Sequence, residues 1–196
     1  MRVADKLGPQ VLVLVARSKV PLSPISSPAI RRRALRMLQA LKLERAELSI
    51  LLCDDRTIHA LNREHRRKDK PTDVLAFAMH EGEEVVGDQQ LLGDVVISLQ
   101  TARRQAKDHA RSLWAEVTML LAHGLLHLVG YDHRTDKEER EMDLEVDRLC
   151  AAVKMTGGAL RKSPLLAPNV TRAHVDKRAA GIVNGPSKQI ARPTAR

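Results

Sequence analysis

The stretch WAEVTMLLAHGLLHLV, residues 114 to 129, decides the fold of this chain. It is the most apolar helical pattern in the sequence, and a helix that is apolar on most sides becomes buried. We therefore expect this helix to lie at the centre of the domain, with the other elements packed around it. It contains His123 and His127, four residues apart, so their side chains project from the same face.

The pattern continues as HGLLHLVGYDH, residues 123 to 133. Gly130 is suited to end the helix, because glycine adopts a left-handed conformation without steric cost. His133 can then return as a third imidazole. Three neutral imidazoles leave one coordination position open, which is typical of a catalytic zinc site. A single histidine in an apolar helix is more simply a core residue, but three at these offsets favour a metal.

The offsets of these histidines and of Gly130 are similar to those of the extended zinc-binding motif of metzincin proteases. That motif carries a glutamate as general base where this chain has Gly124. A glycine cannot accept a proton from water. The sequence therefore predicts the metal ligands of a protease without its base.

The composition indicates one domain with an aliphatic core. The chain has 196 residues and only one each of Trp, Tyr and Phe. No apolar run approaches the roughly 20 residues of a membrane span, and no convincing signal peptide is present. We expect a cytoplasmic protein without a membrane partner. Cys53 and Cys150 are too few for a disulfide scaffold, and we expect both to be small buried residues.

The net charge of +9 is concentrated at the C-terminus. From residue 160 onward there are eight Lys or Arg, four prolines and one acid, Asp176, a net of +7. Residues 1–159 carry a net of only +2. This pattern predicts a metal-dependent hydrolase domain at 1–159 and a basic, disordered tail at 160–196. The tail either binds nucleic acid through phosphate attraction or only solvates the chain.

Apolar periodicity and turn residues predict the elements. The expected strands are 10–17, 48–53, 73–78 and 91–98; the expected helices are 29–41, a helix from Asp54 or Asp55 to 65, then 99–109, 114–129 and one that starts at a capping box of Thr135 with Glu138. The last two strands can pair as a hairpin with a long loop. The fold class predicted is α+β: a small mixed β-sheet with several helices, whose central apolar helix carries two metal-ligand histidines.

A second polar segment precedes the third expected strand. In LNREHRRKDKPTDVLAF, residues 61 to 77, five Lys or Arg fall within eight positions. The planar fork of arginine suits a phosphate, because it donates two parallel charge-assisted hydrogen bonds. Taken alone, this segment is more simply a solvated loop.

Together with the histidine motif, this segment resembles the YbeY family of bacterial endoribonucleases, also called rRNA maturation factors. The resemblance is carried by LNREHRRKDKPTDVLAF, by LLGDVVIS at residues 91 to 98 and by HGLLHLVGYDH, in the order of the family, over roughly residues 50 to 150. The chain departs from the family at Ala76 and Ala78, where Ser and Pro are usual. The basic tail is not part of the family pattern.

The resemblance implies one zinc ion per chain, held by His123, His127 and His133, and a catalytic arginine at Arg66. It implies hydrolysis of single-stranded RNA by metal-activated water, in rRNA processing, notably 16S 3′ end maturation, and in ribosome quality control. The implied partners are the rRNA precursor and the small ribosomal subunit or its assembly factors.

Two other functions stay open. A metallopeptidase-like hydrolase would need a carboxylate base near the zinc, and Gly124 removes the usual one. A non-catalytic ribosome assembly factor would hold a structural zinc with a fourth ligand, such as Asp132 or a cysteine. Asp132 is equally a candidate to orient an imidazole, or only a turn residue before a helix. The role of Asp94 is open.

Overall fold

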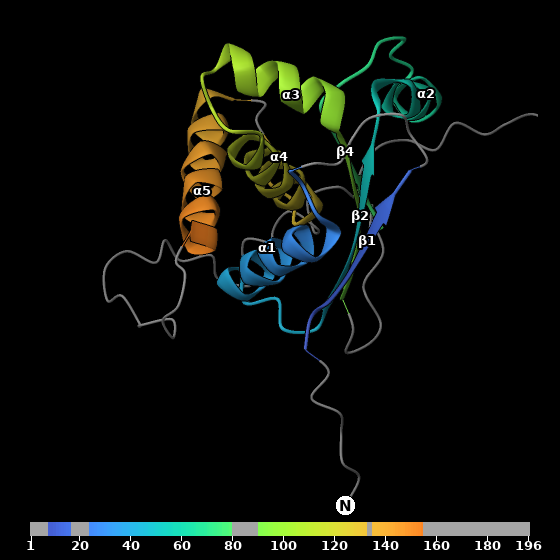
Figure 1. Ribbon diagram of the computed structural model, residues 1–196. Coiled ribbons are helices and arrows are strands. Elements are labelled where there is room, and N and C mark those ends of the chain that lie inside the picture. The colour runs from blue at the N-terminus through green and yellow to red at the C-terminus, as the bar shows by residue number, and fades with distance from the viewer. Residues whose placement is uncertain (1–7, 17–23, 80–89, 133–134, 155–196) are drawn as a thin grey trace, which may run out of the picture. The chain divides into compact units, whose positions relative to one another are not determined.

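The computed structural model describes residues 8–16, 24–79, 90–132 and 135–154 (Figure 1). The chain divides into two units, Met1–Arg161 and Lys162–Arg196, and every described residue belongs to the first. The basic tail predicted at 160–196 and the proposed ligand His133 lie outside the described residues.

In the described part of the chain, four strands form one mixed sheet. The strands are β1 (Gln10–Val15), β2 (Ala46–Cys53), β3 (Val74–Ala78) and β4 (Gln90–Ser98), in the order β1-β2-β4-β3. The first two strands and β4 run parallel, whereas β3 is antiparallel to β4. The predicted mixed sheet and the predicted pairing of the last two strands are both confirmed.

Five helices accompany the sheet in the described residues. They are α1 (Ser27–Ala40), α2 (Asp55–Arg66), α3 (Leu99–Asp108), α4 (Leu113–Leu128) and α5 (Asp136–Lys154). The predicted α+β class is confirmed. The helix α1 begins at Ser27, two residues before the predicted start at residue 29. Pro28 lies in its first turn, where a proline is well tolerated. Asp54 is the N-cap of α2, and its side chain accepts a hydrogen bond from the Thr57 amide.

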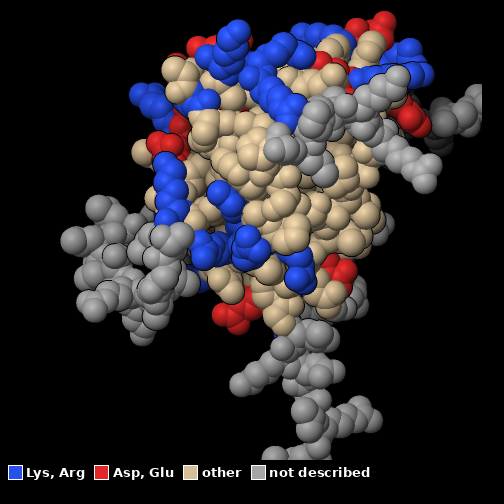
Figure 2. Space-filling model, viewed as in Figure 1, with Lys and Arg blue, Asp and Glu red and all other residues tan. Residues whose placement is uncertain are grey.

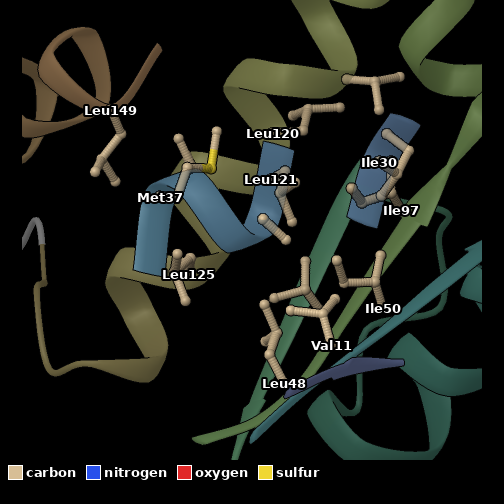
Figure 3. Packing of buried hydrophobic residues seen from close by; sticks show 14 of the residues in the cluster. Val11, Ile30, Met37, Leu48, Ile50, Ile97, Leu120, Leu121, Leu125 and Leu149 are labelled. Atoms are coloured by element: carbon tan, nitrogen blue, oxygen red, sulfur yellow. The ribbon is translucent and has the colours of Figure 1, made fainter. Parts of the chain in front are cut away.

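The central position predicted for α4 is confirmed: it lies between the sheet and α5, and α1 packs beside it on the same sheet face (Figure 1). Figure 3 shows the side chains that meet there. They include Val11, Leu48, Ile50 and Ile97 from the sheet, Ile30 and Met37 from α1, Leu120, Leu121 and Leu125 from α4, and Leu149 from α5. Among the described residues, no helix is long and apolar enough to cross a membrane.

On the opposite sheet face, α2 packs mainly over β4 and β3. A second cluster forms there from Cys53, Ile58, Leu75 and Val96. Burial, and next the charges of Asp54 and Asp55, raise the pKa of the Cys53 thiol to about 12, so this thiol is inert at neutral pH. The prediction of burial is thus confirmed for Cys53, whereas Cys150 is only half-buried.

Gly93 allows β3 and β4 to pair. It follows an irregularity where Glu47 pairs with Leu91 but Leu48 pairs with Gly93. Its φ is +125°, and a Cβ atom there would lie 2.0 Å from the Phe77 carbonyl oxygen. Only glycine fits this bulge, because both the backbone conformation and the close approach exclude a side chain.

Candidate active site

The two histidines of α4 converge at its C-terminal end. Both are half-buried, and their Nε2 atoms lie 3.1 Å apart. The rings stand nearly edge to face, with centroids 4.7 Å apart and an interplanar angle of 84°. The expectation that His123 and His127 share one helix face is confirmed.

The turn after α4 sets the tautomer of His127. Its Nδ1 lies 3.1 Å from the Tyr131 carbonyl oxygen. A carbonyl oxygen only accepts hydrogen bonds, so Nδ1 carries the proton and donates it, which leaves the Nε2 lone pair of the neutral ring directed toward His123. Gly130 makes this possible, because its φ of +90° turns the chain back so that the Tyr131 amide bonds to the Leu126 carbonyl at 3.0 Å.

This geometry fits a metal ion. Two imidazole nitrogens, each about 2.0–2.1 Å from a tetrahedral zinc, are separated by roughly 3.3 Å, close to the 3.1 Å between the two Nε2 atoms. The bond from Nδ1 to a backbone carbonyl is the usual support of a metal-binding histidine. Within the described ranges no group of three or more His, Cys, Asp or Glu side chains is placed to hold a metal, and His133 lies outside those ranges.

Gly124 faces the sheet and is buried. A Cβ atom at this position would lie 2.8 Å from Val95 Cγ1 and 3.2 Å from Val74 Cγ2. The absence of a side chain thus lets α4 lie close against β3 and β4. The same contact leaves no room for the glutamate that the protease motif has at this position. The sequence showed only that a base is absent, and the packing shows why.

Arg66 is the last residue of α2 and is exposed. Its Nη2 donates a hydrogen bond of 2.8 Å to the Ala76 carbonyl, and its guanidinium carbon lies 5.9 Å from the centre of the Phe77 ring. The Asp73 carbonyl and the Met79 amide both form backbone hydrogen bonds with β4. Strand alternation therefore turns the Ala76 carbonyl to the open edge of β3, where Arg66 caps it.

The loop between α2 and β3 is tied to the helix. Arg67 ends α2 in a left-handed conformation with φ of 56°. Asn62 is buried, and its Nδ2 donates to the Lys70 carbonyl at 2.7 Å, while its own carbonyl accepts from the Lys68 amide at 3.2 Å. The basic segment is therefore an anchored loop, not a free one, and it holds its position relative to β3.

The strand β3 contacts both helices that carry predicted site residues, α4 with the histidines and α2 with Arg66. On the core side, Val74 contacts α4 at Gly124, one residue after His123. At the open edge, Ala76 accepts the hydrogen bond of Arg66. The strand β3 thus packs against α4 next to His123 and accepts the hydrogen bond of Arg66.

Asp55, which the sequence suggested only as an alternative N-cap, connects α2 to α3. Its carboxylate accepts hydrogen bonds from the Ser98 and Thr101 hydroxyls and from Arg104, whose Nη1 lies 2.8 Å away. Burial acts to raise the pKa of Asp55, but these three hydrogen bonds together lower it below its ordinary value. An aspartate at a helix start gave no signal of this network, because its partners follow more than forty residues later.

The fold and the site define a class of α+β protein in which a central helix presents two histidines, one turn apart, beside a mixed four-stranded sheet. The family model described as "Endoribonuclease YbeY" matches residues 18–154. The chain belongs to this family, as the sequence resemblance predicted.

Curated relatives support this assignment. The chain is 42% identical to "Endoribonuclease YbeY" of Pelotomaculum thermopropionicum over 149 residues, which cover 74% of this chain and 98% of the relative. It is 42% identical to the protein of the same name from Anaeromyxobacter sp. (strain Fw109-5) over 178 residues, 90% of this chain and 91% of the relative. The protein of that name from Aquifex aeolicus is 45% identical over 138 residues, 70% of this chain and 87% of the relative.

A solved structure shows the same fold. A solution structure of a protein from Thermotoga maritima superposes with a TM-score of 0.53 at 22% sequence identity, covering 74% of this chain and 89% of the other.

Proposed function

We propose that this protein is a zinc-dependent endoribonuclease that hydrolyses single-stranded RNA. The convergence of the His123 and His127 Nε2 atoms, with the His127 Nδ1 bonded to a carbonyl, is the observation that carries the proposal. The printed names of the relatives supply the reaction class, "endoribonuclease".

His123 and His127 would hold the zinc ion, with His133 as the third ligand. A bound zinc would supply a water molecule of lowered pKa and an electrophile for a phosphate oxygen. The Tyr131 carbonyl keeps the His127 ring in the tautomer that binds a metal. Gly124 offers no proton acceptor, so the chain relies on the metal site for the nucleophile.

Arg66 would bind the scissile phosphate. One of its nitrogens is held by the Ala76 carbonyl, which orients the guanidinium, and the remaining donors of this side chain can serve a phosphate. A positioned cation that meets charge as it develops is worth about 10²-fold or more in rate.

The substrate we propose is rRNA precursor, with cleavage at the 3′ end of 16S rRNA and a role in ribosome quality control. The partners would be the small ribosomal subunit or its assembly factors, in the cytoplasm.

The test is cleavage of a single-stranded RNA by zinc-loaded protein. Arg66→Ala should lower the rate about 10²-fold or more. The free energy of unfolding should fall by only about 0.5–1.5 kcal/mol, the net value of the one hydrogen bond to the Ala76 carbonyl that is lost. Arg63→Ala is the matched control, since Arg63 lies one turn earlier on α2 and is exposed as well.

Equal activity of the two variants would assign Arg66 a structural role at the β3 edge. Cleavage of a peptide but not of RNA would support the peptidase alternative. Zinc-dependent folding without any cleavage would support a structural zinc.

A further inference from the structure

The helix α1 carries four arginines and no acidic residue. Arg31, Arg32, Arg33 and Arg36 fall within six positions. Figure 2 shows Lys and Arg side chains gathered over α1 on the face it presents. None of the four belongs to the histidine site or to the segment around Arg66, so the proposed reaction does not account for them.

Two of these arginines are oriented by the protein through Nε. Arg31 donates from Nε to the Val11 carbonyl at 3.0 Å, and Arg33 donates from Nε to Thr118 Oγ1 at 3.1 Å. Such bonds fix the plane of a guanidinium while its terminal nitrogens remain available for the oxygens of a phosphate. Arg32 is exposed and makes no hydrogen bond or ion pair within the described part of the chain.

The neighbouring helix α5 contacts α1 through an arginine and a backbone carbonyl. Arg36 donates from Nη1 to the Val153 carbonyl of α5 at 2.9 Å. Arg148 of α5 lies against the end of α1, where its Nη1 donates to the Ala40 carbonyl at 3.3 Å. The buried carboxylate of Glu145 is paired with Arg148 of its own helix, whose Nε lies 2.8 Å away. Burial, and next the charges of Arg32 and Arg36, lower the pKa of Arg33. The cations of α1 therefore repel one another, and an anion bound there would relieve that cost.

An aromatic ring lies within this surface. The guanidinium carbon of Arg33 is 4.1 Å from the centre of the ring of Trp114, the only tryptophan of the chain. Arginine and aromatic planes together are the combination on which single-stranded nucleic acids stack. Trp114 and His123 are nine residues apart on α4, which is two and a half helical turns. The two residues therefore project from opposite sides of the helix.

We infer that the arginine surface of α1, formed by Arg31, Arg32, Arg33 and Arg36 with Trp114 beside them, is a second contact for the phosphate backbone of RNA, separate from the histidine site. This inference rests on the proposed RNA substrate. A nuclease that holds its substrate at a surface away from the reacting phosphate gains affinity without altering the chemistry of the cut. The expected contact is to phosphates, without sequence preference.

The test is equilibrium binding of a single-stranded 2′-O-methyl RNA oligonucleotide to the full-length protein across a salt series, with the RNA checked for intactness afterwards. Arg32→Glu should weaken binding roughly five- to tenfold at 50 mM salt and reduce the slope of log affinity against log salt by about 0.7, the value for one phosphate contact on a single strand. Arg32→Lys should keep most of the affinity, because a lysine still meets a phosphate as a point charge.

Lys137→Glu is the matched control, since it makes the same change of net charge on an exposed residue in the acidic first turn of α5. It should leave the salt slope unchanged. RNA binding should also change the fluorescence of Trp114, and Arg32→Glu should reduce that change. Equal effects of the two charge reversals would overturn the inference, because only net charge would then matter.

Vesicles that contain phosphatidylserine form the second arm. Binding that depends on Arg32 for vesicles but not for RNA would overturn the inference and assign the surface to a membrane. The proposed function is tested separately. If the zinc-loaded wild-type protein does not cleave RNA, the proposed nuclease activity is wrong, but the salt slopes still report whether α1 binds phosphates.

Discussion

A single backbone carbonyl, that of Tyr131, decides which nitrogen of His127 is available. The 3.1 Å contact to Nδ1 keeps the proton on that atom and presents Nε2 to His123. The cause lies in Gly130, whose φ of +90° returns the chain over the end of α4. A residue with a Cβ atom would strain this turn by roughly 1–2 kcal/mol.

Removal of either histidine should abolish zinc binding. We expect His123→Ala and His127→Ala to lower the zinc content of purified protein from about one per chain to near zero, because two ligands or fewer bind weakly. Metal analysis after dialysis measures this. His59→Ala is the control. His59 lies on α2, and its Nε2 is 2.8 Å from Oδ1 of Asp69 in the loop that follows this helix. Unchanged zinc content in the α4 variants would place the metal elsewhere.

Gly124→Ala should destabilise the protein although alanine is the better helix former. Alanine gains about 1 kcal/mol in a helix interior, but its Cβ would lie 2.8 Å from Val95 Cγ1 in a packed interface. Overpacking of this kind costs about 1–3 kcal/mol. Urea unfolding measures the net effect. Gly8→Ala is the control, because a Cβ atom there meets nothing within 4 Å. A stabilised Gly124→Ala would show that α4 can move away from the sheet freely.

At the scale of elements, the junction of α2 with α3 fixes the start of α2, the helix that ends at Arg66. Asp55 accepts from Ser98, Thr101 and Arg104, and its own amide donates to the Gln100 side chain at 2.9 Å. Ser98 also caps α3, since its Oγ accepts from the Thr101 amide. The α2 helix is therefore fixed at its start by side chains and at its end by the β3 edge.

Asp55→Asn should reduce the free energy of unfolding at pH 7 by roughly 1.5–3 kcal/mol, the value of hydrogen bonds to a charged group. The pKa of Asp55 is lower in the folded protein than in the unfolded chain. Its contribution is therefore full above the ordinary aspartate pKa and disappears as the pH falls through the lowered folded value. Denaturant unfolding of both proteins between pH 7 and pH 3 measures this.

The difference between wild type and Asp55→Asn should shrink toward pH 3. Asp69→Asn serves as control, because the side chain of Asp69 is 75% exposed, and its effect should be small at every pH. A difference for Asp55 that stays constant with pH would show that its charge does not matter.

At the scale of the molecule, the family match ends at residue 154, where α5 also ends. The last buried residue of that helix is Val153, which belongs to the main core. The 178 residues aligned with the Anaeromyxobacter relative reach beyond residue 160, so this relative shares part of the region that follows the helix. We propose that the region from 160 onward adds affinity for RNA.

Deletion of residues 160–196 should leave the unfolding transition of the domain and its zinc content unchanged. It should reduce the affinity for single-stranded RNA mainly at low salt, because the segment carries a net charge of +7. Binding of one RNA across a salt series, full-length against truncated protein, measures this. Identical slopes would mean that the segment does not contact phosphates, and a lost unfolding transition would mean that it packs on the domain.

Local patterns were sufficient to predict most of the elements. The strand expected at 48–53 and the helix expected after Thr135 depend on neighbours along the chain, and both were confirmed, as β2 and α5. The histidine offsets likewise predicted a shared helix face, since four residues complete about one turn. The resemblance to the family rested on such short segments, and the family is confirmed.

Tertiary structure decided what depends on contacts between distant segments. The strand order, the Arg66 bond to Ala76 and the Asp55 network join residues whose separation in the sequence carries no periodic signal. Gly124 is the clearest case. The sequence showed that a base is missing there, but only the packing of α4 on Val95 shows that no side chain fits. Periodicity determines which face of an element is buried, whereas the partner that buries it is chosen by how the whole chain packs.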